Sequence, residues 1–463
     1  MRYLLLIVAI CQLHIVNGQN SLNMTLAYQW SDPTLPASTA HDNIYNEIWG
    51  YENNGREYAI IGTTAGTHIF DITDINNVDT LDFIPGKYQG DQVVHRDYDT
   101  YNDHLYIVCD EGPSSLQIAD LSYLPDSVSL VYDSDSLIIT SHNIFIDANA
   151  GYLYTCGGAT NLGANFLSIY SLSNNPAIPQ FVINCENDIP FWSGSVGYVH
   201  DIYVKNDTAY CNAGHNGLFV VDFSNINNVQ PLGSLTSYLQ QGYNHSGWLH
   251  KSGEYYALAD ENHGLDIKIL DVTDFSDITL IDTIGANANH NLSIVHNLIF
   301  RDDNLFVSHY FDGVYVFNTS DKNNISLAGY YNTSSRAHQN NKYEGCWGVY
   351  PFLSSGKILA SDMQEGLFVF DTAFPIGITE NNKNELAFIV NPNPSKNNIT
   401  VTTTVFDGVI KYSIIDLNGR VVKKGKLNKF QSQLSLNNIP NGVYAISLIQ
   451  ENGNIVTKKV IKN

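Results

Sequence analysis

A histidine recurs at similar intervals along most of this sequence. Six times it stands directly before a short run of alternating apolar residues, and successive copies lie 45 to 58 residues apart: His41, His95, His142, His200, His245 and His296. Imidazole is the commonest metal ligand among side chains and titrates near neutral pH. The pattern therefore predicts a site that a repeated fold assembles from residues distant in sequence.

One segment adds further ligand types at high density. The string ADENHGLD carries Asp260, Glu261, His263 and Asp266 within seven residues. With the recurring histidines, these side chains are candidates for a divalent metal, Zn²⁺ where nitrogens dominate or Ca²⁺ where oxygens dominate. The candidate metal ligands are His95, His142, His200, His245, His296, Asp260, Glu261 and His263.

Two other interpretations of the histidines are open at this stage. A histidine that recurs once per repeat can simply hydrogen-bond the neighbouring turn, which is a structural role. Imidazoles beside carboxylates could also supply an acid and a base for polysaccharide cleavage. Repetition argues against catalysis, because an enzyme needs one asymmetric set of groups. The sequence accordingly assigns no catalytic residue.

The histidines belong to a repeat that occurs seven times. Each copy has an apolar strand, a polar loop with glycine, and a second apolar strand that ends in a short polar residue. Such a residue can accept a hydrogen bond from the following turn. Four short strands per repeat at this period predict an all-β fold, namely a seven-bladed β-propeller. The closing residues are Asp71, Asp120, Ser171, Asp222, Asp271, Asn318 and Asp371.

The two ends of the array are expected to meet. The seventh copy stops near Phe374 without a fourth strand, and MTLAYQWS (residues 24–31) resembles the outer strand of the sixth copy, ISLAGYYN. An N-terminal strand that completes the last blade would cover both free edges. The histidines should then ring one mouth of the channel, together with these residues of the loops between second and third strands: Asp110, Glu111, His215, Asp260, Glu261, His263, His309, Asp312, Asp362 and Glu365.

Strings in the body resemble a known family. NEIWGYENNGREYAIIGTTAGTHIFDITD and EGCWGVYPFLSSGKILASDMQEGLFVFDT are similar to the choice-of-anchor B family, which is built from LVIVD-type propeller repeats. The resemblance covers nearly all of residues 24–374. It implies a propeller and an extracellular location, and it carries no activity that could be transferred residue by residue.

The last part of the chain resembles a second family. NPNPSKNNITV, YSIIDLNGRVVKKG and the final strands from IPNGVYAISL to KKVIKN are similar to the type A C-terminal sorting domain of the type IX secretion system of Bacteroidetes. Alternating apolar residues between Asn-Gly turns also predict a small β-sandwich. The resemblance implies a cargo that the type IX secretion machinery handles through this domain.

The N-terminus is typical of a secretory signal. Arg2 precedes a short apolar segment, and Val16 and Gly18 suit a cleavage before Gln19. No other segment is long and apolar enough to predict a membrane span. The predicted parts are a signal peptide (1–18), the propeller (19–376), a linker (377–388) and the sorting domain (389–463).

Charge and cysteine content narrow the class of protein. The chain has 23 Lys+Arg against 46 Asp+Glu, a net charge of −23, which argues against a nucleic-acid partner. Residues 19–385 hold 12 basic and 43 acidic residues, whereas residues 386–463 hold 10 and 3, so two differently charged modules are joined. The five cysteines after residue 18 are too few for a disulfide scaffold and are expected to be small buried residues.

These observations predict a secreted or cell-surface propeller that acts as a ligand-binding or interaction module for an unknown extracellular ligand. The alternative is a metal-dependent extracellular enzyme that acts on glycans at the histidine-rich mouth. Walker loops, GxSxG elbows and HExxH motifs are absent from the sequence.

Overall fold

The computed structural model describes residues 21–161, 163–285, 290–374, 388–391, 393–403, 410–416, 420–427, 431–449 and 455–463. The predicted signal peptide, and the predicted linker except residue 388, lie outside these residues. The chain divides into two compact units, residues 1–378 and 379–463, and each is described by itself.

The larger unit consists of seven antiparallel sheets within the described residues, and each sheet follows one predicted repeat. In the first sheet, the strands are β3 (Tyr45–Asn53), β4 (Arg56–Thr63), β5 (Gly66–Asp71) and β6 (Asp79–Pro85). Strand β4 is buried along nearly all its length, whereas β6 is mostly exposed. This difference explains why the second strand of each copy is a continuous apolar run and the fourth is more polar.

The next three sheets repeat this order. The second comprises β7 (Arg96–Tyr101), β8 (His104–Cys109), β9 (Leu116–Asp120) and β10 (Ser129–Ser134). The third comprises β11 (Thr140–Asp147), β12 (Tyr152–Thr160), β13 (Gly163–Ser171) and β14 (Gln180–Asn184). The fourth comprises β15 (Asp201–Lys205), β16 (Thr208–Asn212), β17 (Leu218–Asp222) and β18 (Gln230–Leu235).

The remaining sheets of this unit receive the N-terminal strands. The fifth comprises β19 (Asn244–Leu249), β20 (Tyr255–Asp260), β21 (Ile267–Asp271) and β22 (Thr279–Ile284). The sixth comprises β23 (Leu298–Arg301), β24 (Asn304–Ser308), β25 (Val314–Asn318), β26 (Ser326–Tyr331) and β1 (Ser21–Leu22). The seventh comprises β27 (Cys346–Tyr350), β28 (Ile358–Asp362), β29 (Gly366–Thr372) and β2 (Met24–Trp30).

The predicted pairing of the chain's beginning with the last repeat is confirmed. Strand β2 runs antiparallel to β29, with Met24 opposite Thr372 and Trp30 opposite Leu367. The first strands of successive sheets contact one another from β3 through β23, and β27 contacts both β24 and β3. The sheets therefore follow one another in space as the repeats do in sequence, and the first and last sheets are neighbours.

The turns after the third strands form as predicted. In six repeats, the closing side chain accepts a hydrogen bond from the backbone N–H two residues later, as Asp120 does from Ser122 at 2.8 Å. In the seventh repeat, the corresponding N–H, that of Ala373, donates instead to the carbonyl of Asn23. The N-terminal segment thus replaces this turn where it joins the seventh sheet.

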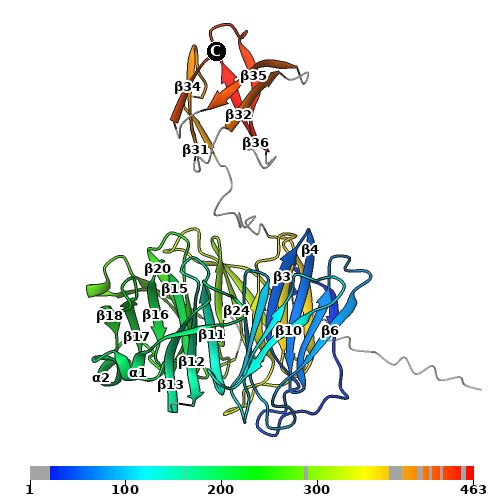
Figure 1. Ribbon diagram of the computed structural model, residues 1–463, viewed down its shortest axis with the longest axis vertical. Coiled ribbons are helices and arrows are strands. Elements are labelled where there is room, and N and C mark those ends of the chain that lie inside the picture. Colours follow the sequence, from blue (N-terminus) through cyan, green and yellow to red (C-terminus); the bar gives the residue numbers. More distant parts are fainter. Residues whose placement is uncertain are drawn as a thin grey trace, which may run out of the picture. The chain divides into compact units, whose positions relative to one another are not determined.

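Among the residues that the structure describes, three short helices lie outside the sheets. They are α1 (Cys185–Asp188), α2 (Trp192–Ser195) and one turn of 3₁₀ helix at Phe275–Asp277. Helix α1 contacts β13, β14 and α2, and Figure 1 shows α1 near β13. Within the described residues, no helix has the length and apolar character needed to cross a bilayer.

The described residues of the smaller unit form two antiparallel sheets. One has the order β30 (Phe388–Asn391), β31 (Asn398–Thr403), β34 (Gln431–Ser435). The other has the order β33 (Val421–Leu427), β32 (Ile410–Asp416), β35 (Gly442–Ile449), β36 (Ile455–Lys462). Side chains from both sheets share one apolar core that includes Ile399, Ile414 and Ile446.

Every cysteine that the structure describes is buried and unpaired: Cys109, Cys156, Cys185, Cys211 and Cys346. Burial raises the pKa of the Cys211 thiol, as expected for a thiol in apolar surroundings. These residues are part of the core, as the sequence predicts.

Candidate metal centre

Five of the recurring histidines lie next to one another at the beginning of the first strands. We call His95, His142, His200, His245 and His296 the histidine mouth. Consecutive imidazole centroids are 4.1–4.6 Å apart, and the Trp347 ring lies 4.3 Å from His296 and 5.3 Å from His95. The seventh repeat thus contributes an indole where the second to sixth repeats contribute imidazoles, and the six rings follow one another in a closed series.

The first repeat departs from the predicted pattern. His41 lies before β3 and outside the series of rings, and its imidazole contacts the ring of Tyr343. The strand position that histidine occupies in the other sheets is taken by Asn46, whose amide donates to the carbonyl of Val94 at 3.2 Å. The spacing of His41 from the apolar run is longer than in the other copies, which explains the shift.

The histidine mouth surrounds a cavity of about 280 Å³. Because the residues come from several sheets, the cavity is a product of the fold rather than of any one segment. Besides the five histidines, its lining residues are His41, Val94, Asp110, Glu111, Glu261, Tyr310, Tyr343 and Trp347.

Hydrogen bonds fix the orientation of three imidazoles. The Nδ1–H of His200 donates to the carbonyl of His245 at 3.1 Å, and that of His296 donates to the carbonyl of Trp347 at 2.5 Å. A carbonyl oxygen can only accept, so in the neutral ring the lone pair is on Nε2. His142 makes the same contact through Nδ1 to the Asp110 carboxylate at 2.9 Å.

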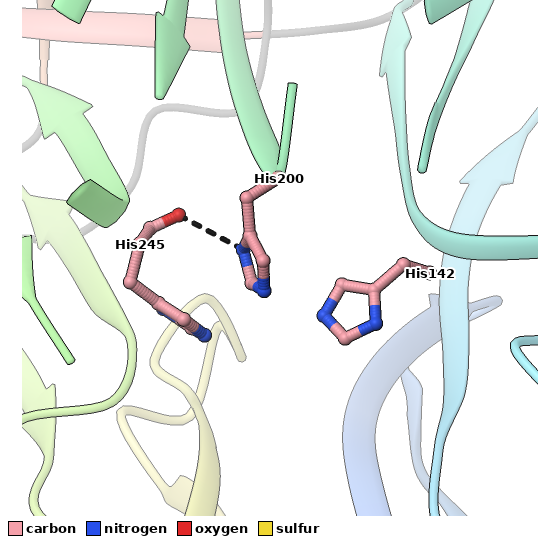
Figure 2. A group of neighbouring side chains, drawn as sticks. All are labelled: His142, His200 and His245. Atoms are coloured by element: carbon pink, nitrogen blue, oxygen red, sulfur yellow. Dashed lines mark hydrogen bonds between the residues drawn. The ribbon is translucent and has the colours of Figure 1, made fainter. Parts of the chain in front are cut away.

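These contacts are made by three of the five histidines, whereas Nδ1 of His95 and of His245 is buried without a hydrogen-bond partner among the described residues. They link neighbouring sheets, which is the structural role that the sequence leaves open. They also leave Nε2 available, and a metal-ligating histidine usually donates its other N–H to a carbonyl or carboxylate in this way. Figure 2 shows the imidazoles of His142, His200 and His245 turned toward one another.

Burial keeps most of these rings neutral. It lowers the pKa of His95, His200 and His245 well below the usual value, and neighbouring imidazoles lower it further. Burial also lowers the pKa of His296, to about 3. For His142, burial lowers the pKa, but the hydrogen bond that its ring donates to the Asp110 carboxylate and the charge of that carboxylate outweigh burial, so the pKa is raised. A histidine must be neutral to bind a metal, so His95, His200, His245 and His296 have the protonation state that metal binding requires.

Two overlapping sets of three side chains have the spacing of a metal site. His142, His200 and His245 each offer one ligand atom, and these atoms lie within 4.8 Å of one another. The same holds for His245, Glu261 and His296. A tetrahedral zinc ion at about 2.0–2.1 Å from each nitrogen needs separations of about 3.4 Å, so small side-chain rotations would close either set.

Glu261 is the acidic member of the cavity. Its Oε2 lies 3.8 Å from His245 Nε2, and its Oε1 accepts a hydrogen bond from the Tyr310 hydroxyl at 2.5 Å. Burial raises the pKa of Glu261 to about 7. Tyr310 has a φ of 38°, an uncommon left-handed backbone for an aromatic residue. The backbone at Tyr310 is therefore strained at the position that holds Glu261.

The structure does not bring Asp260 and His263 to this cavity. Asp260 is fully buried and forms an ion pair with Lys268, whose Nζ lies 2.6 Å from Oδ2. His263 is half-buried and contacts the carbonyl of Lys342 through Nε2. Adjacent side chains of an extended segment point in opposite directions, which separates Glu261 from Asp260. His263 lies in the turn that follows and is not among the lining residues of the cavity.

Of the other loop residues that the sequence singles out, some line the cavity and others do not. Asp110 and Glu111 line the cavity. His309 and His338 instead contact the Asp312 carboxylate, at 3.3 and 2.9 Å, and Asp362 accepts from the hydroxyl of Thr333. Tyr310 and Tyr343 line the cavity and were not singled out, because an aromatic residue in a loop carries no sequence signal for a site.

A second group that sequence reasoning missed lies further along the first strands. Glu47, Asp97 and Asp201 line a smaller cavity of about 80 Å³. Burial raises the pKa of Asp97 to about 7 and that of Asp201 to about 8, and mutual repulsion contributes for Asp201. Nothing in the residue spacing distinguishes these carboxylates from ordinary surface aspartates, so only the fold reveals them.

Comparison with known proteins identifies the smaller unit. Residues 390–463 match the family model of the secretion system C-terminal sorting domain. This domain marks the chain as a protein that is secreted or placed on the outer surface by the type IX secretion system. No curated protein matches the chain.

Solved structures show only weak likeness. One similar structure is that of PorZ, an essential bacterial surface component of the type-IX secretion system of Porphyromonas gingivalis. It has a TM-score of 0.45 and 11% sequence identity to this chain, and the alignment covers 94% of this chain and 61% of PorZ. The RRP9 WD40 repeats give 0.47 at 9% identity, over 73% and 99%. A copper-containing fungal alcohol oxidase of the AA5 family gives 0.46 at 10% identity, over 96% and 100%. This chain thus spans about three fifths of the length of the first of these structures.

Proposed function

We propose that this protein is a secreted or outer-surface β-propeller that binds one divalent transition metal ion at the histidine mouth. Its seven sheets correspond to seven blades of LVIVD type, as in the choice-of-anchor B family that the sequence resembles. The smaller unit is a β-sandwich through which the type IX secretion machinery handles the chain. The metal, or a molecule that binds to it, is the ligand of the propeller.

The observation that carries this proposal is the arrangement of the Nδ1 contacts. Nδ1 contacts a carboxylate oxygen in His142 and a backbone carbonyl oxygen in His200 and His296. In these three residues Nε2 is therefore the atom available to bind a metal. A merely structural histidine needs one such bond, but it need not share a cavity with four others. Nitrogen-rich sites of this kind favour Zn²⁺, Cu²⁺ and Ni²⁺ over Ca²⁺.

The stoichiometry follows from His245. This residue belongs to both sets of three ligands, so occupation of one set removes a ligand from the other. One ion per chain is therefore expected, held by His245 with neighbouring imidazoles or with Glu261. An open coordination position would face the cavity.

Calorimetric titration of the chelator-treated full chain with Zn²⁺ tests the proposal. We expect one ion per chain, and an affinity that falls at least about 10-fold in His200→Gln and His245→Gln, as ligand-shell changes commonly cause. The matched control is His104→Gln, because His104 does not line the mouth and its Nδ1 contacts the Asn102 carbonyl in its own turn. Equal affinities of His245→Gln and His104→Gln would overturn the proposal, because both sets of three ligands contain His245.

The second candidate is a metal-dependent enzyme acting on extracellular glycans. It is favoured by the Glu261–Tyr310 pair, because a carboxyl group with a pKa of about 7 is suited to proton transfer near neutral pH. Reducing-sugar release from polysaccharides by the zinc-loaded chain, lost in Glu261→Gln, would support it. Zinc binding without turnover would leave the binding function alone.

A further inference from the structure

A third cavity, separate from the two described above, lies at the other end of the sheets. His142 lies near the beginning of β11 and Asp147 ends it, while His200 precedes β15 and Asn206 follows it. The cavity, of about 570 Å³, is therefore at the end of the third and fourth sheets opposite the histidine mouth. We call it the Asp147 pocket.

Oxygen-bearing side chains dominate the Asp147 pocket. They come from the β11–β12 turn, the β15–β16 turn and the loop after β17, and none of the residues that line the pocket is basic. Nitrogen and sulfur ligands are also absent from its lining. The polar members are Asp147, Asn206, Asp207, Ser224, Asn225 and Asn227, with Asn149 beside them.

Asp147 supplies an independent sign that something binds here. The residue is only 5% exposed and lines the pocket. Its Oδ1 accepts from the backbone N–H groups of Asn149 and Ala150, at 2.9 and 3.4 Å. Its Oδ2 is buried without a hydrogen-bond partner in the part of the chain that the structure describes, and so is the hydroxyl of Tyr154. Buried polar atoms normally have partners, so an orphaned carboxylate oxygen points to a missing ligand.

The charges around Asp147 favour a cation as that ligand. Burial raises the pKa of Asp207, and repulsion from Asp147 and Asp222 raises it further. Burial raises the pKa of Tyr154, and the charges of Asp147 and Asp207 raise it further. Carboxylates that repel one another across a pocket without a basic residue are stabilised by a bound positive ion.

We propose that the Asp147 pocket binds Ca²⁺. Carboxylate and amide oxygens are the ligands that calcium prefers, and the spacing of Asp147 and Asn149 by two residues occurs also in calcium loops. The width of the pocket suits calcium, which accepts six to eight ligands including water, better than Mg²⁺, which demands a compact octahedron. The ion would connect the third and fourth sheets.

This site is independent of the histidine mouth. It uses no residue of that site, and its ligand is a hard cation rather than a transition metal. With two carboxylates in the pocket, the affinity should be that of extracellular calcium modules, with Kd of about 0.1–1 mM. Such a site would be filled outside the cell, where the sorting domain directs the chain.

The test is a titration of the chelator-treated full chain with Ca²⁺ between about 0.05 and 5 mM, followed by melting temperature. We expect a rise of about 2–4 °C that grows with calcium concentration, and a smaller rise with Mg²⁺. Tb³⁺ luminescence sensitised by Tyr152, which lines the pocket, gives a direct measure of binding. Calcium should displace Tb³⁺ in the same concentration range.

Two variants and two controls separate this site from other acidic regions. Asp147→Asn keeps an oxygen that can accept the hydrogen bonds from Asn149 and Ala150 but removes the negative charge. Asp207→Asn is the second variant, to be used if Asp147→Asn does not fold. Both should lose the calcium-dependent rise, whereas Asp126→Asn, at an exposed turn, and Glu261→Gln, at the mouth, should retain it. Absence of the rise in the unsubstituted chain, or its persistence in both pocket variants, would overturn the proposal.

Discussion

Replacing Lys268 by methionine should destabilise the larger unit strongly, because it leaves Asp260 as a buried, uncompensated charge. Both side chains of this ion pair are fully buried, and Nζ lies 2.6 Å from Oδ2. The other oxygen of Asp260 accepts from the hydroxyl of Tyr238 and the N–H of Gly242, at 2.8 and 3.1 Å. Methionine keeps the length of the side chain but gives Oδ2 nothing to replace the ammonium. Breaking one partner of such a pair costs about 3–5 kcal/mol.

Denaturant unfolding followed by tryptophan fluorescence measures this loss. All five tryptophans lie before residue 378, so the signal reports on the larger unit alone. The matched control is Lys251→Met. Lys251 is half exposed and pairs with Asp303 at 2.9 Å, and loss of an exposed pair should cost less than about 1 kcal/mol.

A double variant completes the test. Asp260→Asn combined with Lys268→Met removes both charges while keeping an acceptor for Tyr238, so it should recover a large part of the lost stability. Its zinc affinity should equal that of the unsubstituted chain, because Asp260 does not line the mouth. A loss below about 1.5 kcal/mol in the single variant would refute the energetic argument. Reduced zinc affinity in a folded double variant would refute the assignment of Asp260 to the core.

Three further predictions concern the mouth, the closing strand and the thiols. Zinc affinity should fall as the pH decreases from 8 to 6, because the raised pKa of His142 means that protons compete with the metal there first. In Asp110→Asn, which removes the negative charge that helps to raise this pKa, the fall should occur at lower pH. Equal profiles in calorimetric titrations would contradict the assignment. Removal of residues 19–31 should lower the melting temperature and promote association detectable by light scattering, because β29 would lose β2 and expose its edge. The five described cysteines should react with a thiol reagent only after unfolding, and reductant should leave the melting temperature unchanged.

Much of the candidate site could be predicted from repetition. Five histidines at the same place in five repeats must lie together if the repeats form equivalent sheets, and the structure places them side by side. The prediction fails where it depends on the direction of single side chains. Asp260 and Glu261 are adjacent in sequence, yet one pairs with Lys268 in the core and the other lines the mouth.

By itself, the sequence determined the all-β class, the seven repeats, the pairing of residues 24–30 with the last repeat and the sorting domain. These features depend on local periodicity and turn chemistry, which each segment carries whatever its surroundings. Only the tertiary structure decided which atoms face one another. Whether the lone pair of His200 is at Nδ1 or Nε2 depends on a carbonyl 45 residues away, and whether Asp147 has a partner depends on a neighbouring sheet. Such contacts follow from how strands twist and pack, and no spacing within a single strand encodes them.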